Sequence, residues 1–387
     1  MSKPAALSAQ QLYTRCDLNA FSFISTAELE EIKVFVGQER AMDALKFVVG
    51  IQREGFNLYV LGPVGYGKHG MIRQYLEQLH DETQAADDWC YVGNFVEPQK
   101  PIAIRFPAGQ GRVFKQDMQQ LVDELRTAIP GAFETEQYHI RLQEIQDSFH
   151  EQNQQAFIEL AQEAEKHHIA VLRSAMEITF VPEKDGRTIT SEEYDALDED
   201  EKQRLEQIIA VLEEKVQSIL RQRPQWQREV REKIKTLNRE VGLFAVGHLI
   251  DELKEKYVEI EAVENYLDRV QENVIRNLRA FRHVEIGDEI PEEEQQQSFR
   301  DYQVNLLVDN SDNKGAPIVY EDNPTFPSLI GRVEYISQMG TLITDYMLIK
   351  PGALHKANGG YLILDAIKVL TQPFAWEGLK RIISSGH

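Results

Sequence analysis

Hydrophobic side chains recur at helical spacing through the middle of this 387-residue chain. From about residue 114 to residue 282, apolar positions are separated by steps of three and four, the period of a helix with one buried face. The pattern predicts helices over 114–128, 134–169, 198–241, 243–257 and 262–281. Prolines at 130 and 224 are expected to break or kink them, and Asp185-Gly186 is expected to turn a small β-hairpin. Packing of helix on helix explains these apolar stripes without a cofactor.

Shorter apolar runs with strand character lie on both sides of this helical segment. They cover 56–60, 89–92 and 102–106 before it, and 304–310, 329–334, 341–347 and 361–365 after it. Within 34–50, a helix is expected after a turn at Gly37, and further helices are expected at 71–79 and 369–383. The sequence therefore predicts a discontinuous α/β P-loop domain in two pieces, 1–113 and 301–387, with a large α-helical domain inserted at 114–300.

A glycine-rich turn, LGPVGYGKHG at 61–70, separates the run at 56–60 from the helix expected at 71–79. Glycines in such a turn let the backbone direct its N–H groups inward, and Lys68 would reach the terminal phosphates of a nucleotide. The predicted phosphate-binding residues are Gly62, Pro63, Gly65, Gly67, Lys68 and His69. An active loop of this type has Ser or Thr after the lysine, to ligate Mg²⁺. Because His69 is a poor ligand for Mg²⁺, weak binding of ATP or ADP and poor Mg²⁺ coordination are expected.

A second part of the nucleotide site is expected where the run at 361–364 ends in Asp365. An acidic residue at the carboxyl end of a parallel strand can hold Mg²⁺ near the phosphate loop. Hydrolysing enzymes of this class follow that aspartate with a glutamate, which activates water. Here Ala366 follows it, and loss of one general base costs about 10²–10⁴ in rate. The sequence therefore predicts little or no ATP hydrolysis.

The composition limits the classes of partner that are expected to bind this protein. The net charge is −21 and the pI is about 5.0, which argues against general affinity for nucleic acid or for an anionic membrane. No stretch approaches the roughly 20 apolar residues that span a bilayer. The N-terminus lacks the apolar core of a signal peptide, and two cysteines fit a reducing compartment, so a cytoplasmic protein is expected.

Four segments resemble the Lon-like AAA+ proteases, and most closely the LonC-type branch with a helical insertion. They are GQERA at 37–41, GFNLYVLGPVGYGKHG at 55–70, NPTFPSLIGRVEY at 323–335 and PGALHKANGGYLILDA at 351–366. The resemblance implies an AAA+ module that assembles as a hexameric ring, with Gly37 and Gln38 beside the adenine. It places a substrate-gripping loop at Tyr335 and Ile336.

The same resemblance implies that the helical insertion captures unfolded or damaged polypeptides. Proteins of this kind continue into a protease domain with a Ser nucleophile and a Lys base, and the parent would be a serine endopeptidase. No catalytic residue of that domain is assigned here, since only about twenty residues follow Asp365. A fragment of a longer protein is therefore expected.

Two other classes remain open. One is a P-loop ATPase with a coiled-coil insertion that acts on chromosomes or DNA. The prolines at 130, 182 and 224, which predict short bundle helices, and the acidic charge both disfavour it. The other is a non-enzymatic scaffold or adaptor that keeps a degenerate nucleotide site.

Overall fold

The structure is a computed structural model. It describes residues 6–29, 37–51, 53, 55–63, 65–80, 83–173, 178–184, 187–190, 193–194, 196–281, 299–338 and 340–385. The chain divides into two compact units. Residues 1–82 and 377–387 form unit 1, and residues 83–376 form unit 2.

Unit 1 is built from short helices. These are η1 (Leu18–Ala20), η2 (Thr26–Glu28), α1 (Glu39–Val49), α2 (Lys68–His80) and most of α13 (Ala375–Ser385). Helices were expected at the positions of α1 and α2, and both are confirmed. The strand predicted at 56–60 is wrong, because these residues form no strand and leave Phe56 and Tyr59 57% and 72% exposed. An apolar run becomes a strand only when a neighbour supplies hydrogen bonds, and no described strand pairs with this one.

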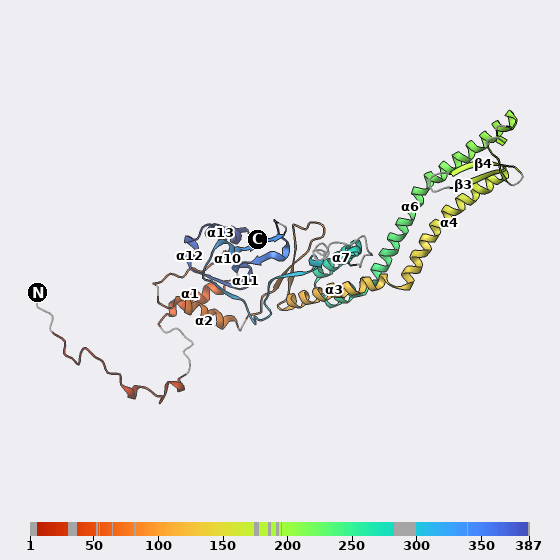
Figure 1. The fold of residues 1–387 in the computed structure, drawn as a ribbon. Coiled ribbons are helices and arrows are strands. Elements are labelled where there is room, and N and C mark those ends of the chain that lie inside the picture. Colours follow the sequence, from red (N-terminus) through yellow and green to blue (C-terminus); the bar gives the residue numbers. More distant parts are fainter. Residues whose placement is uncertain are drawn as a thin grey trace. The chain divides into compact units, whose positions relative to one another are not determined.

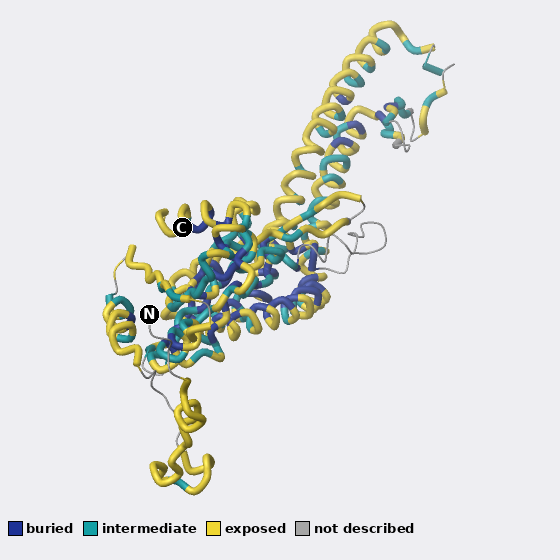
Figure 2. Tube along the Cα trace, turned by 90° about the vertical axis from the view of Figure 1, so that its left-hand side faces the viewer, coloured by how far each residue is buried: buried dark blue, intermediate teal, exposed yellow. Residues whose placement is uncertain are grey.

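The main core of unit 2 lies between an antiparallel sheet and helices. The sheet has the order β2-β1-β6, from β1 (Asp88–Val92), β2 (Ile102–Phe106) and β6 (Val304–Val308), and all three strands were predicted. Helix α3 (Gln110–Phe133) buries Phe114, Met118 and Leu125 in this core. Helices α7 (Glu261–Arg276) and α8 (Leu278–Phe281) contribute further buried residues. Figure 2 colours the buried parts of the chain dark blue. Pairing of β1 with β6 therefore joins segments about two hundred residues apart.

The break expected at Pro130 is also wrong, because α3 continues through it to Phe133. Pro130 lies in the last turn, where it removes a single hydrogen bond. The buried side chains of Ile129 and Phe133 extend the apolar stripe on either side. Their burial outweighs the loss of one hydrogen bond near a helix end.

Helices α4 (Glu136–Lys166) and α6 (Glu199–Lys256) run side by side and are called the helical arm below (Figure 1). They are antiparallel: Tyr138 donates to Asn238 at 2.9 Å near one end, and Lys215 pairs with Glu163 at 3.3 Å near the other. The break expected at Pro224 is wrong, because α6 is one helix of 58 residues. Packing against α4 on both sides of the proline offsets its cost, about 3 kcal/mol in a helix interior.

A small sheet packs near the far end of the helical arm. Its order is β3-β4-β5, from β3 (Ile169–Arg173), β4 (Ile178–Lys184) and β5 (Arg187–Thr188). Strands β4 and β5 confirm the predicted hairpin, although its turn lies outside the described residues. Strand β3 was not predicted, since residue 169 was assigned to the helix. That helix ends at Lys166, and His168 has φ +56°, a backbone conformation that ends the helix. Side chains of the sheet and the arm form a second core, separate from the first.

The last part of unit 2 pairs β7 (Ile318–Glu321) with β12 (Tyr361–Leu364) in parallel. Two antiparallel pairs lie between them in sequence: β8 (Gly331–Val333) with β11 (Ile349–Pro351), and β9 (Ile336–Gln338) with β10 (Thr341–Ile343). Short helices are α10 (Phe326–Ile330), η3 (Tyr346–Leu348), α11 (Ala353–Lys356) and α12 (Ala366–Thr371). The single helix expected at 369–383 is two helices, α12 and α13, because Pro373 forces the residue before it out of the helical region. None of the described helices is long and apolar enough to cross a membrane.

Candidate nucleotide and polypeptide sites

The phosphate loop lies in unit 1, immediately before α2. Gly65 and Gly67 have φ of +89° and +71°, which only glycine adopts readily, and an added Cβ would meet no atom within 4 Å at either position. The two glycines are therefore required by backbone conformation and not by close packing. The Lys68 ammonium donates to the Gly62 carbonyl at 2.8 Å, across the loop. Residue 64 lies outside the described residues.

These residues fit a phosphate group. A lysine folded over a glycine-rich turn, at the start of a 13-residue helix, provides a cation beside backbone N–H groups. They fit Mg²⁺ less well: His69 is exposed and has no oxygen to offer. Among the described residues, no group of three or more His, Cys, Asp or Glu could hold a metal ion. Of the other predicted nucleotide contacts, Pro63, Gly37 and Gln38 are exposed, and Gln38 precedes α1 as its N-cap.

Asp365 lies in unit 2, where it follows β12 and caps α12. Its Oδ1 accepts hydrogen bonds from the backbone N–H groups of Ile367 and Lys368, at 2.9 and 3.4 Å. The structure therefore gives this carboxylate a structural role, and describes it and the phosphate loop in separate units. That they form one nucleotide site stays a prediction.

A second acidic side chain lies at the same sheet edge. Asp322 follows β7, which is parallel to β12, so both carboxylates come at the carboxyl ends of neighbouring strands. Asp322 pairs with Lys368 at 2.5 Å, and this hydrogen bond lowers the pKa of the aspartate. Asp322 was not predicted, because its strand has only three apolar or aromatic residues, Ile318–Tyr320, and Glu321 separates them from the aspartate.

The β9–β10 hairpin exposes apolar side chains. Tyr335 is 62% exposed, Ile336 39% and Leu342 68%. Leu342 lies opposite Ser337 and Ile343 opposite Ile336. Side chains alternate along a strand, so Leu342 and Tyr335 lie on one face of the hairpin. Ile336 lies on the other face. The structure thus adds Leu342 to the two residues expected at a polypeptide-gripping loop.

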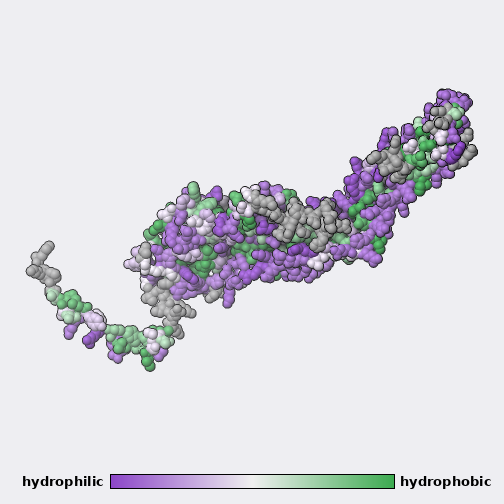
Figure 3. Space-filling view, viewed as in Figure 1, coloured by the Kyte–Doolittle hydropathy of each residue, from purple (hydrophilic) through white to green (hydrophobic). Residues whose placement is uncertain are grey.

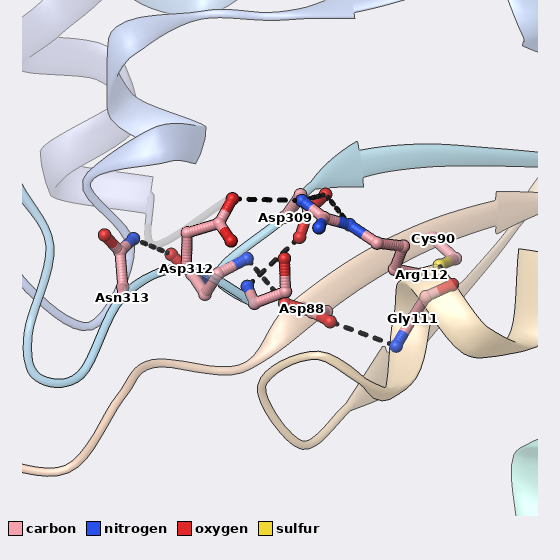
Figure 4. Close-up of polar contacts among 9 residues, drawn as sticks. Asp88, Cys90, Gly111, Arg112, Asp309, Asp312 and Asn313 are labelled. Carbon is pink, nitrogen blue, oxygen red and sulfur yellow. Dashed lines mark hydrogen bonds and ion pairs between the residues drawn. The ribbon is translucent and has the colours of Figure 1, made fainter.

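Asp88 is a further polar residue that sequence analysis missed, and it is fully buried. Its carboxylate accepts from the backbone N–H groups of Gly111, at 3.0 Å, and Asn310, at 2.7 Å (Figure 4). It thereby caps α3, whose own N-cap residue, Gly109, has no side chain. Burial raises the pKa of Asp88, and the N–H donors oppose that effect.

Two neighbours of Asp88 reinforce this junction. Arg112 donates to Asp309 at 2.9 Å, which ties α3 to the loop after β6. Cys90 lies on β1 with its Sγ 3.9 Å from the Gly111 carbonyl, and burial raises the pKa of the thiol to about 12. Because the thiolate is the reactive form, Cys90 is not a nucleophile here. The cluster joins α3, β1 and β6 and has no catalytic geometry.

Comparison with protein families indicates the class of protein. Residues 314–387 match the family model described as LonB-like, AAA domain. Residues 88–121, which hold β1, β2 and the first half of α3, match the one described as Lon-like LonC helical domain. The chain therefore carries segments of a Lon-like AAA+ protein, as its sequence motifs predict. No curated protein matches the chain.

Proposed function

We propose that the chain is the AAA+ module and substrate-capture domain of a Lon-like serine protease that degrades unfolded or damaged polypeptides. In this proposal the α/β domain is discontinuous, the helical domain is inserted into it, and the full protein assembles as a hexameric ring in the cytoplasm. The observation that carries the proposal is the exposed apolar hairpin β9–β10, within the segment that matches a LonB-like AAA domain.

The hairpin is suited to contact a polypeptide because its apolar side chains are not packed in either hydrophobic core. Clustered apolar side chains in water are unfavourable and commonly mark an interaction surface. An extended, unfolded chain offers apolar side chains on both faces of its backbone. Tyr335 and Leu342 on one face of the hairpin, with Ile336 on the other, could contact such a chain from two sides.

Two substitutions in the nucleotide site support loss of hydrolysis. His69 stands where Mg²⁺ needs a hydroxyl, and Ala366 stands where water needs a base. The phosphate loop and Lys68 still support binding of ATP or ADP. Nucleotide would then stabilise the fold or the ring without being consumed.

One observation favours the coiled-coil ATPase as a second candidate. The α4–α6 pair is long, antiparallel and uninterrupted, so the prolines do not disfavour this class of ATPase. The net charge of −21 and the two Lon-like matches still favour the protease. A scaffold or adaptor would share the degenerate nucleotide site and differ in having no protease partner domain.

The proposal is tested by removing the apolar side chains of the hairpin. The double variant Tyr335→Ser/Leu342→Ser should bind a fluorescently labelled, carboxymethylated unfolded protein at least about tenfold more weakly, since each contact buries apolar surface worth about 1 kcal/mol or more. Fluorescence anisotropy measures the affinity. Val258→Ser is the matched control, because Val258 is 70% exposed but lies outside the hairpin, and it should bind normally. Unchanged binding by the double variant would contradict the proposal.

A further inference from the structure

Helix α6 carries seven cationic residues in a short stretch of an acidic protein. They are Arg221, Arg223, Arg228, Arg231, Lys233, Lys235 and Arg239, and all of them are exposed. The stretch from 221 to 239 contains two acidic residues, Glu229 and Glu232. Its local charge is therefore opposite to the net charge of −21 of the whole chain.

Five of these cations share one face of the helix. At 100° per residue, Arg221, Arg228, Arg231, Lys235 and Arg239 fall within an arc of about 80°, which extends about 27 Å along the axis. We call these five residues the basic strip. Glu232 lies beside the strip, and Arg223 and Lys233 point elsewhere around the helix.

The basic strip is not neutralised by the residues that the structure describes. None of its five side chains forms an ion pair with a described acidic group, including Glu232 and, on α4, Asp147 and Glu151. Arg221 and Arg231 contact only neutral oxygens, those of Gln217 and Gln227. Two other cations on the arm are paired across its helices: Arg141 with Glu240 at 2.8 Å, and Lys215 with Glu163. The strip is thus a positive surface that the described residues leave uncompensated. The face of the arm seen in Figure 3 is largely hydrophilic, with hydrophobic patches along its length.

We propose that the basic strip docks an acidic segment of an extended polypeptide. The inference rests on the proposed function and names the kind of substrate segment that the helical arm receives. Guanidinium groups bind carboxylates through paired hydrogen bonds, so arginine suits this role better than lysine, and four of the five residues are arginine. Leu220, 47% exposed, lies at the edge of the strip and would contact apolar side chains beside the carboxylates.

A polypeptide fits this surface better than a nucleic acid does. Duplex DNA carries one charge per about 1.7 Å, so it would extend beyond the strip and meet the acidic remainder of the protein. A polypeptide segment can confine a few carboxylates to the length of the strip. The strip should therefore bind acidic segments with an affinity that falls as salt screens the charges.

The test compares two variants with the same change in charge on the same stretch of α6. Arg228→Gln/Lys235→Gln removes two strip cations, and Arg223→Gln/Lys233→Gln removes the two that lie off it. Gln has a helix propensity close to that of Arg and Lys, so α6 should persist in both, and circular dichroism checks this. The probes are two labelled unfolded peptides of equal length and apolar content, one with glutamates and one with glutamines in their place.

The unchanged protein should bind the glutamate peptide more tightly at about 50 mM salt, a preference that should shrink at about 500 mM salt. The strip variant should lose about tenfold in affinity for the glutamate peptide alone, whereas the off-strip variant should lose little. Equal losses in both variants, or no preference for glutamate, would overturn the inference. Tighter binding of a single-stranded oligonucleotide than of the glutamate peptide would overturn it too.

The hairpin variant separates this inference from the proposed function. If Tyr335→Ser/Leu342→Ser loses binding of both peptides while the strip variant does not, the inference about the basic strip is wrong and the proposed function stands. If the unchanged protein binds neither peptide, both are wrong.

Discussion

Lys68 and the glycines before it define the predicted phosphate loop at the scale of single residues. The lysine bridges the phosphate loop through the Gly62 carbonyl, and the glycines keep the left-handed conformations that the turn needs. His69 and Ala366 stand at the two positions where the motifs predict loss of an oxygen ligand for Mg²⁺ and of a base for water. These two positions could be identified from the sequence, because each lies at a fixed spacing within a known motif.

The nucleotide site should bind without turnover. We expect weak ADP binding by calorimetry, abolished in Lys68→Ala, and ATPase activity at least about 10²-fold below that of an intact site, because the general base is missing. Arg73→Ala is the control, because it removes a cation from the same helix that lies outside the loop and pairs with Glu77, and it should leave ADP affinity nearly unchanged. Steady Mg²⁺-dependent turnover that disappears in Lys68→Ala would contradict this prediction.

His355 should make stability depend on pH. Its Nδ1 accepts from the Gly352 N–H at 3.2 Å, and burial lowers its pKa below the ordinary value of 6.5. The unfolded chain takes up a proton as the pH falls through about 6.5, whereas the folded chain resists it, so stability is greatest above that pH and declines below it.

The variant His355→Asn keeps an acceptor near the same position and cannot titrate. Urea unfolding at pH 7.5 and pH 5.0 should show a larger loss of stability for the unchanged protein than for the variant. Equal losses would mean that His355 does not carry the pH dependence.

At the scale of elements, periodicity predicted the helices well and their ends poorly. The stripe predicted to end before Pro130 continues through it to the end of α3, and the stripes predicted at 198–241 and 243–257 belong to the single helix α6, which runs through Pro224. A proline costs about 3 kcal/mol in a helix interior, but the packing of a whole helix against its neighbour can exceed that. Helix propensities give the free-energy cost of the proline, but they contain no information about the helix that packs beside it.

Predicted strands formed where a partner strand supplied hydrogen bonds. The runs at 89–92, 102–106 and 304–310 became β1, β2 and β6 because they pair with one another. The run at 56–60 has equal apolar character and forms no strand. Strand formation depends on hydrogen bonds from a second segment, which can be two hundred residues away, as β6 is from β1.

At the scale of the whole molecule, unit 2 contains two hydrophobic cores. The first includes the sheet, α3, α7 and the near ends of α4 and α6, and the second lies under β3 and β4 on the arm. No buried residue belongs to both. The two cores should therefore unfold independently, as cooperative units with few shared contacts do.

Replacing residues 150–229 by a short Gly-Ser turn should test this independence. The deletion removes the second core and part of the basic strip, but keeps Tyr138, Leu237 and Val246, which belong to the first core. The shortened protein should retain the cooperative transition of the first core, monitored by tryptophan fluorescence from Trp89. Loss of that transition would show that the arm is needed for the first core to fold. A deletion that reached α3 or α7 could not serve as a test, because it would remove the first core itself.

The sequence by itself predicted a phosphate loop without two of the groups that hydrolysis needs, and it predicted most of the helical segments, because those predictions depend on residue type and short spacing. It also determined the Lon-like resemblance through four local motifs. Only the tertiary structure decided that Asp88 caps α3, that Leu342 joins Tyr335 on an exposed hairpin, and that α6 is one helix with an unpaired basic strip. Each of these depends on contacts between segments far apart in the chain, or on the absence of such contacts among the described residues, and burial and pairing exist only in the folded protein.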